Sequence, residues 1–394
     1  MAVVAAFNNK KNIVIIMDNN KIAAIVRYLL WAGLFAFSLV RGFVYGHWKL
    51  LITVAGVFAI SIVTLITAKR KQRGSWEEMI EKNHSDEVYI PEQEVVDAMQ
   101  KKSQAITDEI NRICPPQPCL RFVIDKKRKA TIFDSKLGGM PFWDSSKQYP
   151  VDSKGKPMAM VFQVNFEQCP HLELLPQSGL LQFFISSDDE IMFDGYGVDY
   201  NDYTSQKDFR VVYHSSVATP ADKSQLESYP RIETLKDTPV FGEYAVNVLQ
   251  DKSFINETCG TFASIASQAV KNLFGEDMEE QYVSEYIKRM LPEEHRDQVP
   301  DELVLGENPM FQGVSEDNFQ MLGFPAFEQY DEREDNSNYD ILLLQIPTID
   351  AEDSDNDCRY HTIWGDCGSA RLFINAEALR NLDFSKVLYE FQCY

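Results

Sequence analysis

Two long hydrophobic runs lie near the start of the chain. Residues 50–68 read LLITVAGVFAISIVTLITA and contain no charged side chain. A helix of that length rises roughly 28 Å, which is close to the hydrocarbon thickness of a bilayer. Residues 22–40 form a second run, whose Arg27 lies near one end, where its side chain can reach the membrane interface. The pattern predicts a membrane anchor in residues 1–73, a helical hairpin that meets lipid through residues 22–68.

Each run has an alternative interpretation. The run at 22–40 could be a cleaved signal peptide, but it shows no obvious small-residue cleavage site, and the run at 50–68 follows it at once. The run at 50–68 could be a buried helix of a soluble core, although such helices seldom stay apolar over this length. We therefore favour a transmembrane hairpin with spans at about 22–40 and 50–68. Whether the first run crosses the bilayer completely stays open.

Basic residues flank the two runs unevenly, and this predicts the orientation. Only two basic residues lie between the runs, whereas four lie at or before the start of the first run and four directly follow the second. Lys and Arg collect on the cytoplasmic side of membrane segments. Both termini and the soluble part are therefore predicted to be cytoplasmic. The outer groups are Lys10, Lys11, Lys21 and Arg27, then Lys69, Arg70, Lys71 and Arg73; the loop holds Arg41 and Lys49.

After a polar linker at 74–90, residues 91–394 are predicted to form the soluble domain. Residues 91–113 place apolar side chains at three- and four-residue intervals from Val95 to Ile113, which is typical of an amphipathic helix. Pro91 suits the first turn, and Pro115 with Pro116 ends the helix. Two further helices are predicted near 260–274 and 279–291.

Short apolar runs bounded by turn residues predict strands through the rest of the chain. Because strands and helices do not alternate regularly, we expect an α+β, β-rich fold with mostly antiparallel sheets. The predicted strands are CLRFVI (119–124), MAMVFQVNF (158–166), GLLQFFIS (179–186), FRVVYH (209–214), YDILLLQI (339–346), SARLFIN (369–375) and KVLYEFQ (386–392).

These runs recur in the same order in two parts of the domain. LGGMPFW (137–143) and LGFPAF (322–327) each precede an apolar strand that carries a glutamine, Gln163 or Gln345, and a strand led by glycine follows in both parts. The pattern predicts an internal duplication, with halves at about 119–214 and 318–394. Chance similarity among strands is the alternative.

The same segments resemble a known family. SKLGGMPFW (135–143), LPQSGLLQFFIS (175–186), NFQMLGFPAFEQYD (318–331) and the C-terminal run 363–394 are similar, in this order, to the YwqG-like family of bacterial domains of unknown function. The resemblance implies an α+β, β-rich fold with internal duplication. It implies no activity, cofactor or catalytic residue, and the shared domain lacks the hairpin predicted here.

Charge separates the two parts of the chain. Residues 1–73 hold ten basic residues and one acid, Asp18, whereas the whole chain carries a formal charge of −21. The acidic body should be repelled by nucleic acid, so no nucleic-acid partner is expected. The seven cysteines are an odd number in a long chain, which favours reduced thiols over a secreted disulfide scaffold.

No motif fixes a reaction, a metal or a cofactor. The acidic run at 350–357 fails as a calcium loop because Cys358 and Trp364 stand where Gly and Glu are required. The six histidines show no zinc spacing, and the sequence contains no G-x-S-x-G element. Whether the protein is an enzyme stays open, and we assign no catalytic, cofactor-binding or metal-binding residue.

The most unusual cluster is WGDCG at 364–368, whose glycines indicate a tight turn with a close backbone approach. It is either a packing corner or the rim of a groove. The candidate groove or turn residues are Gly138, Gly139, Pro141, Trp143, Gln163, Gln345, Trp364, Gly365, Asp366 and Gly368.

Three functional hypotheses follow. The first is a membrane-anchored module that binds a protein or ligand through its sheet surface or edges. The second is a hydrolase-type enzyme with a site between the two halves, which requires converging Cys, His and acidic side chains. The third is a passive structural protein.

Overall fold

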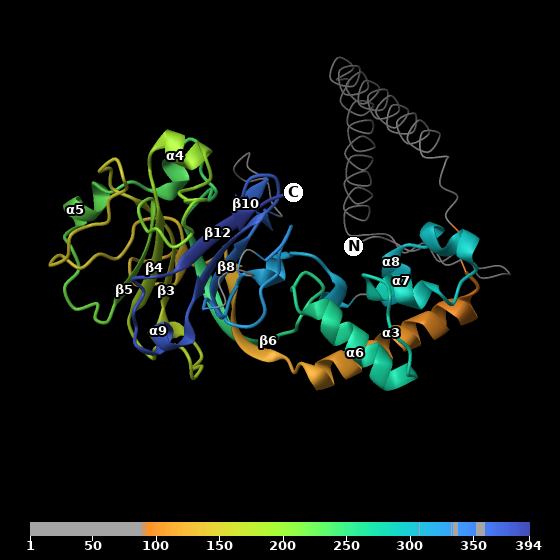
Figure 1. Ribbon diagram of the computed structural model, residues 1–394. Helices are drawn as coiled ribbons and strands as arrows, with labels where there is room; N and C mark the ends of the chain where they lie inside the picture. The colour runs from red at the N-terminus through yellow and green to blue at the C-terminus, as the bar shows by residue number, and fades with distance from the viewer. Residues whose placement is uncertain (1–88, 90, 307, 332, 334–337, 352–358) are drawn as a thin grey trace, which may run out of the picture. The chain divides into compact units, whose positions relative to one another are not determined.

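Strand pairing organises the protein, as the computed structural model in Figure 1 shows. The structure describes residues 89, 91–306, 308–331, 333, 338–351 and 359–394. The predicted spans at 22–40 and 50–68 lie outside these residues, as does the predicted linker 74–90 apart from Tyr89. Within the described part of the chain, no helix combines the length and the apolar character needed to span a membrane.

Ten strands form one sheet in the order β12-β11-β8-β7-β1-β6-β2-β3-β4-β5, and all neighbours pair antiparallel. This confirms the β-rich, mostly antiparallel prediction. The strands are β1 (Gln117–Asp125), β2 (Lys136–Leu137), β3 (Ala159–Asn165), β4 (Leu180–Ile185), β5 (Phe209–His214), β6 (Tyr244–Ser253), β7 (Gln320–Met321), β8 (Ile341–Pro347), β11 (Ser369–Ile374) and β12 (Leu388–Gln392). A separate hairpin joins β9 (Ile349–Asp350) to β10 (Tyr360–Thr362).

The centre of the sheet is the long pair β1–β6, in which Val123 lies opposite Asn247. Outward from this pair, β7, β8, β11 and β12 follow on one side, and β2, β3, β4 and β5 follow on the other. Gln163 of β3 pairs with Lys136 of β2, and Gln345 of β8 pairs with Gln320 of β7.

The sheet curls so strongly that it is nearly a barrel and its two edge strands approach each other. Rings from opposite ends of the sheet meet in one core: Tyr389 of β12 lies 5.0 Å from Phe183 of β4 and 4.9 Å from Phe209 of β5, measured between ring centroids. Side chains alternate along a strand, so Leu181 and Phe183 of β4 face this inner core, whereas Phe184 faces a second cluster outside the sheet. Loop segments cover that outer face.

The helices pack together in a cluster of their own. In α3 (Gln93–Ile113), Val96, Met99, Ile106 and Ile110 are buried, as the apolar stripe predicted, and Cys114 caps the helix just before the two prolines. This stripe packs against the helices that follow the sheet strand β6. These are α6 (Phe262–Phe274), α7 (Val283–Lys288) and α8 (Asp301–Leu305).

One predicted helix differs from the observed element, and several observed strands were not predicted. The predicted helix 279–291 is only the six-residue α7, because Pro292 follows closely and a turn replaces its last residues. The sequence did not predict β6, and it did not predict the two-residue strands β2 and β7. The remaining short helices are α4 (Asp189–Phe193), α5 (Lys223–Glu227) and α9 (Ala376–Arg380).

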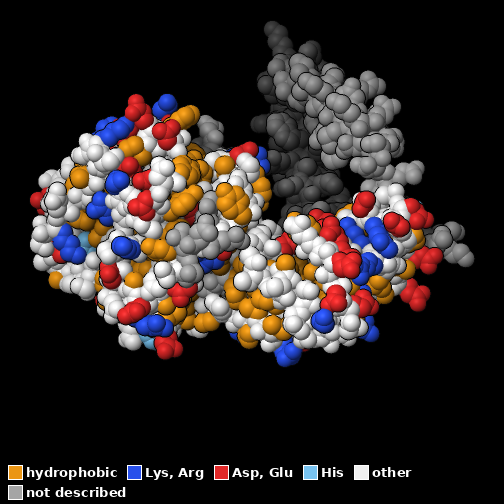
Figure 2. All heavy atoms as spheres, viewed as in Figure 1, with side chains coloured by type: hydrophobic (Ala, Val, Ile, Leu, Met, Phe, Trp, Pro, Cys, Tyr) orange, Lys and Arg blue, Asp and Glu red, His pale blue; other side chains and the backbone are white. Residues whose placement is uncertain are grey.

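Charges of opposite sign lie next to each other on the helical part. Figure 2 shows basic side chains beside acidic ones around α7 and α8, where Lys288 pairs with Asp301 at 2.5 Å. Pairs of this kind on the surface stabilise a fold by about 1 kcal/mol or less. They give no evidence of a charged docking patch on this face.

Candidate functional site

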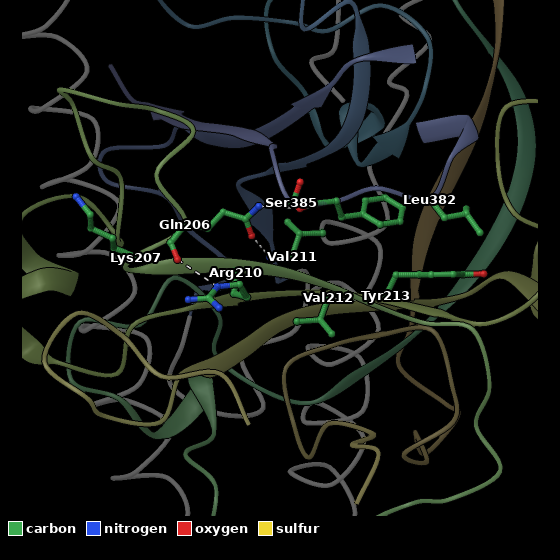
Figure 3. Close-up of a pocket in the computed structure, with 9 residues that line it drawn as sticks. Gln206, Lys207, Arg210, Val211, Val212, Tyr213, Leu382 and Ser385 are labelled. Carbon is green, nitrogen blue, oxygen red and sulfur yellow. Dashed lines mark hydrogen bonds between the residues drawn. The ribbon is translucent and has the colours of Figure 1, made fainter. Parts of the chain in front are cut away.

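A shallow groove of about 670 Å³ lies where the two ends of the sheet meet. We call it the seam groove. Figure 3 shows residues of β5 and the turn before it on one side, with Leu382 and Ser385 on the other. Val211 and Phe384, both buried, form part of its floor. Its lining is Gln206, Lys207, Arg210, Val211, Val212, Tyr213, Leu382, Phe384 and Ser385.

The backbone of β5 presents hydrogen-bonding groups to this groove. Val211 donates its N–H to the side chain of Gln206 at 2.9 Å, and the Tyr213 carbonyl accepts from Lys147 Nζ at 3.3 Å. In an antiparallel strand both polar groups of one residue point the same way, and direction alternates between residues. The N–H and carbonyl groups of Phe209, Val211 and Tyr213 therefore point away from β4, toward the free edge.

The side-chain amide of Gln206 bridges the seam. Its Oε1 accepts from Val211 N at 2.9 Å, and its Nε2 donates to the Phe384 carbonyl at 2.7 Å. An amide that accepts on one side and donates on the other satisfies two facing backbones, as the peptide group of an intervening strand does. One side chain thus substitutes for one peptide unit between β5 and the segment that leads into β12.

The edge of β12, by contrast, is covered. Tyr389 donates its N–H to the Tyr203 carbonyl at 2.9 Å, and its hydroxyl donates to the Tyr196 carbonyl at 3.3 Å. The chain between α4 and β5 therefore runs along β12 and uses its outward groups. Of the two edge strands, β5 is the one that faces the groove.

A second cavity, of about 250 Å³, lies beside the central strand β1. His361, Asp350, Glu316 and Asp317 contribute to its lining, together with Arg121 and apolar side chains. No Cys, Ser or Thr side chain is among the described residues that line it. A nucleophile with a converging base and acid, which the hydrolase hypothesis requires, is not assembled there.

The candidate residues of the first half lie in a tight turn and behind it. Gly138 and Gly139 adopt positive φ values of 61° and 74°, and a Cβ on Gly138 would lie 2.3 Å from the Gly242 carbonyl oxygen. The turn is held by Lys136, whose buried Nζ donates to the Met140 carbonyl and to Glu243 Oε1. Burial is the main cause that lowers the pKa of this lysine.

Behind that turn, buried amides form a chain. Gln163 Oε1 accepts from the Phe142 N–H, which follows Pro141, and from Gln182 Nε2, at 3.1 and 2.7 Å. His214 Nε2 lies 2.9 Å from Gln182 Oε1. Trp143 is 2% exposed and donates its indole N–H to the Lys147 carbonyl, so it is a core residue.

The remaining candidate residues lie around β8 and β11, where they too make buried hydrogen bonds or form tight turns. Gln345 exchanges hydrogen bonds with the backbone of Ala326, accepting at 3.1 Å and donating at 2.8 Å. A Cβ on Gly368 would lie 1.8 Å from the Gln392 carbonyl oxygen, so a close backbone approach requires this glycine. Trp364 is buried, Gly365 has a φ of 55°, and the Asp366 carbonyl accepts from the Tyr394 N–H.

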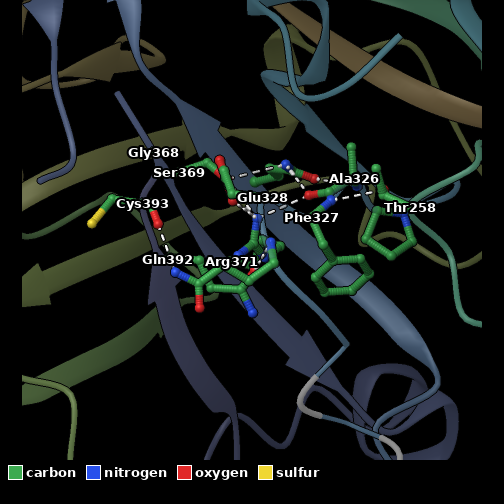
Figure 4. A network of polar contacts seen from close by, with 12 residues as sticks. Thr258, Ala326, Phe327, Glu328, Gly368, Ser369, Arg371, Gln392 and Cys393 are labelled. Atoms are coloured by element: carbon green, nitrogen blue, oxygen red, sulfur yellow. Dashed lines mark hydrogen bonds and ion pairs between the residues drawn. The ribbon is translucent and has the colours of Figure 1, made fainter. Parts of the chain in front are cut away.

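Beside Gln345 lies a fully buried ionic cluster, drawn in Figure 4. Arg371 donates to Glu390 Oε1 at 2.5 Å and to Glu328 Oε2 at 2.8 Å, and also to the Ser369 hydroxyl at 2.6 Å. The two carboxylates raise the pKa of the guanidinium against the effect of burial. None of the residues that the sequence singled out lines the seam groove.

Cys119, Cys169 and Cys259 are not activated as nucleophiles. Burial raises the pKa of Cys119 and of Cys259 to about 11 and that of Cys169 to about 12. A thiol that stays protonated at neutral pH is a poor nucleophile. Among the residues with described positions, no cluster of His, Cys, Asp and Glu is arranged to hold a metal.

Sequence reasoning missed the residues of the seam groove. It predicted the strand 209–214, but no local pattern showed that this strand would be an edge. Gln206 and Phe384 are 178 residues apart in the chain. Only the curl of the sheet brings them together.

Comparison with known proteins identifies the family but no activity. No curated protein matched the chain. A family model described as "Domain of unknown function (DUF1963)" matches residues 135–393, well over half of the 394 residues. The match agrees with an uncharacterised YwqG-like family, and it includes the turns at Gly138 and Gly368 and the whole seam groove. The chain therefore belongs to the DUF1963 family.

Proposed function

We propose that this protein is a binding module that pairs the free edge of β5 with an extended segment of a partner protein. The observation that carries the proposal is the Gln206 amide, which occupies the place of a peptide group between Val211 and Phe384. Exposed strand edges are templates for pairing with another chain, and several recognition domains bind peptides by adding a strand.

The shape of the groove supports an extended occupant. The floor combines apolar side chains, Val211 and Phe384, with outward backbone groups at alternate residues of β5. Backbone pairing would supply affinity, and the apolar floor would take alternate side chains of the added strand.

The membrane hairpin at 22–40 and 50–68 belongs to the same proposal. Its support is the uncharged sequence and the basic residues around it. The anchor would hold the domain at the cytoplasmic face, where partner segments near the membrane are reached at a high effective concentration.

We also propose that the halves 119–214 and 318–394 are copies of one unit. The matching strand orders on either side of β1–β6 support this, as do the hydrogen bonds that Gln163 and Gln345 accept from Phe142 and Ala326. Each copy then contributes one edge strand to the seam. The chain between α4 and β5 covers one of them and leaves the other for a partner.

Two substitutions at one hydrogen bond test strand addition. Both Val211→Pro and Gln206→Ala break the bond between Val211 N–H and Gln206, but only the proline removes the donor that a partner strand needs. Peptides are selected against the full-length chain from a random display library, and their affinities are then measured. We expect Gln206→Ala to bind at least as tightly as the wild type and Val211→Pro to lose binding.

Hydrogen exchange on the wild-type protein provides a check that needs no variant. Pairing at the edge should slow exchange of the Val211 and Tyr213 amides, while amides of the covered strand β12 stay unchanged. Equal affinity for the proline variant, shown to be folded by its near-ultraviolet circular dichroism, would rule out strand addition at β5. Selected peptides that protect neither amide would do the same.

A further inference from the structure

The seam groove is cationic on an acidic protein. Its described lining contains Lys207 and Arg210 but no Asp or Glu, although the chain as a whole carries a formal charge of −21. Association is favoured where the charge of a groove opposes that of its ligand, and this acts mainly on specificity and on the rate of encounter. The local charge therefore distinguishes between classes of partner.

Arg210 is available for a ligand carboxylate. Its Nε donates to the Gln206 carbonyl at 3.1 Å, which holds the guanidinium beside the bridge. Among the described residues, no carboxylate lies within ion-pair distance of Arg210. Lys207 is 70% exposed, and its pair with Asp199 at 3.8 Å is weak in water. Asp202 also interacts with Lys207 electrostatically.

The register of β5 sets where Arg210 lies, and Lys207 lies in the turn just before the strand. Phe209 and Val211 point into the inner core, so Arg210 lies on the opposite, outer face of the strand. Residues directly opposite each other on paired strands, and on the same face, have Cβ atoms about 4.5–5.5 Å apart. A strand added to β5 would place every second side chain on the face of Arg210.

We infer that the partner is an acidic extended segment of another protein, with Asp or Glu at alternate positions that face Arg210 and Lys207. The inference rests on the strand addition proposed above and names its ligand chemistry. The backbone of the segment displaces the Gln206 side chain from Val211 N–H and from the Phe384 carbonyl. Its acidic side chains then pair with the two cations at the rim of the groove.

Synthetic peptides of alternating residues test the charge preference on the full-length protein. The four probes are eight-residue peptides with Glu alternating with Val, the same peptide with Gln or with Lys in place of Glu, and the Glu peptide with N-methylated backbone. We expect the Glu peptide to bind at least about fivefold more tightly than the Gln peptide at low salt, with the difference shrinking as salt screens the charges. Among the three peptides with an unmodified backbone, the Lys peptide should bind most weakly, and the N-methylated peptide should not bind.

Variants that lack the two cations test whether Lys207 and Arg210 cause the preference for the Glu peptide. The double variant Lys207→Gln, Arg210→Gln should bind the Glu and Gln peptides alike, whereas Lys223→Gln, at a surface lysine that is 83% exposed, should keep the preference. Equal binding of the Glu and Gln peptides by the wild type overturns the acidic partner but leaves strand addition intact, provided the N-methylated peptide fails to bind. Undiminished binding of the N-methylated peptide overturns both. If two copies of this protein associate through the edge of β5, and the peptides compete with that association, then the partner is a second copy of the chain and not another protein.

Discussion

At the scale of single residues, two strands use different chemistry to fill similar buried positions. Gln182 of β4 lies opposite Val212 and contacts His214, all without a net charge, whereas Arg371 of β11 lies opposite Glu390 and pairs with two carboxylates. Each side chain fixes the loop segment that covers the outer face of the sheet. The neutral version depends on one imidazole staying uncharged, and the ionic version depends on one guanidinium.

Replacing Arg371 with methionine should strongly destabilise the fold. The substitution leaves Glu328 and Glu390 buried without their cation, and breaking a buried ion pair on one side typically costs about 3–5 kcal/mol. Urea unfolding of the variant measures the loss. Arg112→Met, at a guanidinium that is 67% exposed and pairs with Glu109, is the control and should change stability far less.

Removing the two carboxylates as well separates charge from packing. A triple variant that adds Glu328→Gln and Glu390→Gln to Arg371→Met should recover part of the loss, because no uncompensated charge then stays buried. If Arg371→Met alone unfolds at the same urea concentration as the wild type, the cluster does not hold the covering segment.

The buried His214 predicts a loss of stability in acid. Burial lowers its pKa to about 4 from an ordinary 6.5, so the unfolded chain takes up a proton first as the pH falls. The stabilisation is complete above pH 6.5 and is lost progressively toward pH 4. At pH 4.5 the loss of stability from this group amounts to about 2.5 kcal/mol.

His214→Gln tests this, because a glutamine amide can still donate to Gln182 Oε1 without titrating. Melting temperatures of the variant and the wild type are compared at pH 7.5 and pH 4.5. The melting temperature of the wild type should fall further between pH 7.5 and pH 4.5 than that of the variant. Equal losses would mean that other groups account for the acid sensitivity.

At the scale of elements, the turns that carry Gly138 and Gly368 are among those with no room for a side chain. Gly138→Ala forces a methyl group to 2.3 Å from a backbone oxygen, whereas Gly275, at the end of α6, has a similar φ of 71° and open space around it. We expect Gly275→Ala to cost about 1–2 kcal/mol, the strain of a left-handed residue, and Gly138→Ala to cost clearly more. Denaturant midpoints compare the two, and equal losses would contradict a packing role for the turn.

The strands that the sequence predicted could be recognised for one physical reason. All six residues of β4 and of β11 are buried, so their apolar runs are continuous and stand out from the surrounding turns. In contrast, β6 carries exposed polar residues from Gln250 to Lys252 and lies at the centre only because β1 pairs along its whole length. A two-residue strand such as β2 is too short to show any period.

The candidate site was predicted less well than the strands. The glycines and the two glutamines that the sequence singled out do hold close approaches and buried hydrogen bonds. They mark the places where loops attach to the sheet. The seam groove depends instead on the pairing of distant segments, which leaves no local signal in either one.

At the scale of the whole molecule, one geometric fact links fold and proposed function. Ten antiparallel strands curl until β5 and β12 approach each other, but a side chain and not a backbone ladder joins them at Gln206. A closed barrel has no edge, whereas this sheet keeps one. Under the proposed function, a strand from another chain would take the place of the Gln206 side chain at this seam.

A last prediction for the whole molecule concerns its location in the cell. The hydrophobic runs at 22–40 and 50–68 should keep the full-length chain in the membrane pellet until detergent is added, and carbonate or high salt should not release it. Ala59→Arg together with Ile62→Arg places two charges near the middle of the second span, at about 2.5–3.5 kcal/mol each, and should reduce insertion. Lys69→Ala is the matched control outside the span. Wild-type protein that stays in the supernatant after ultracentrifugation without detergent would contradict the anchor, and the seam groove would then serve a partner free in solution.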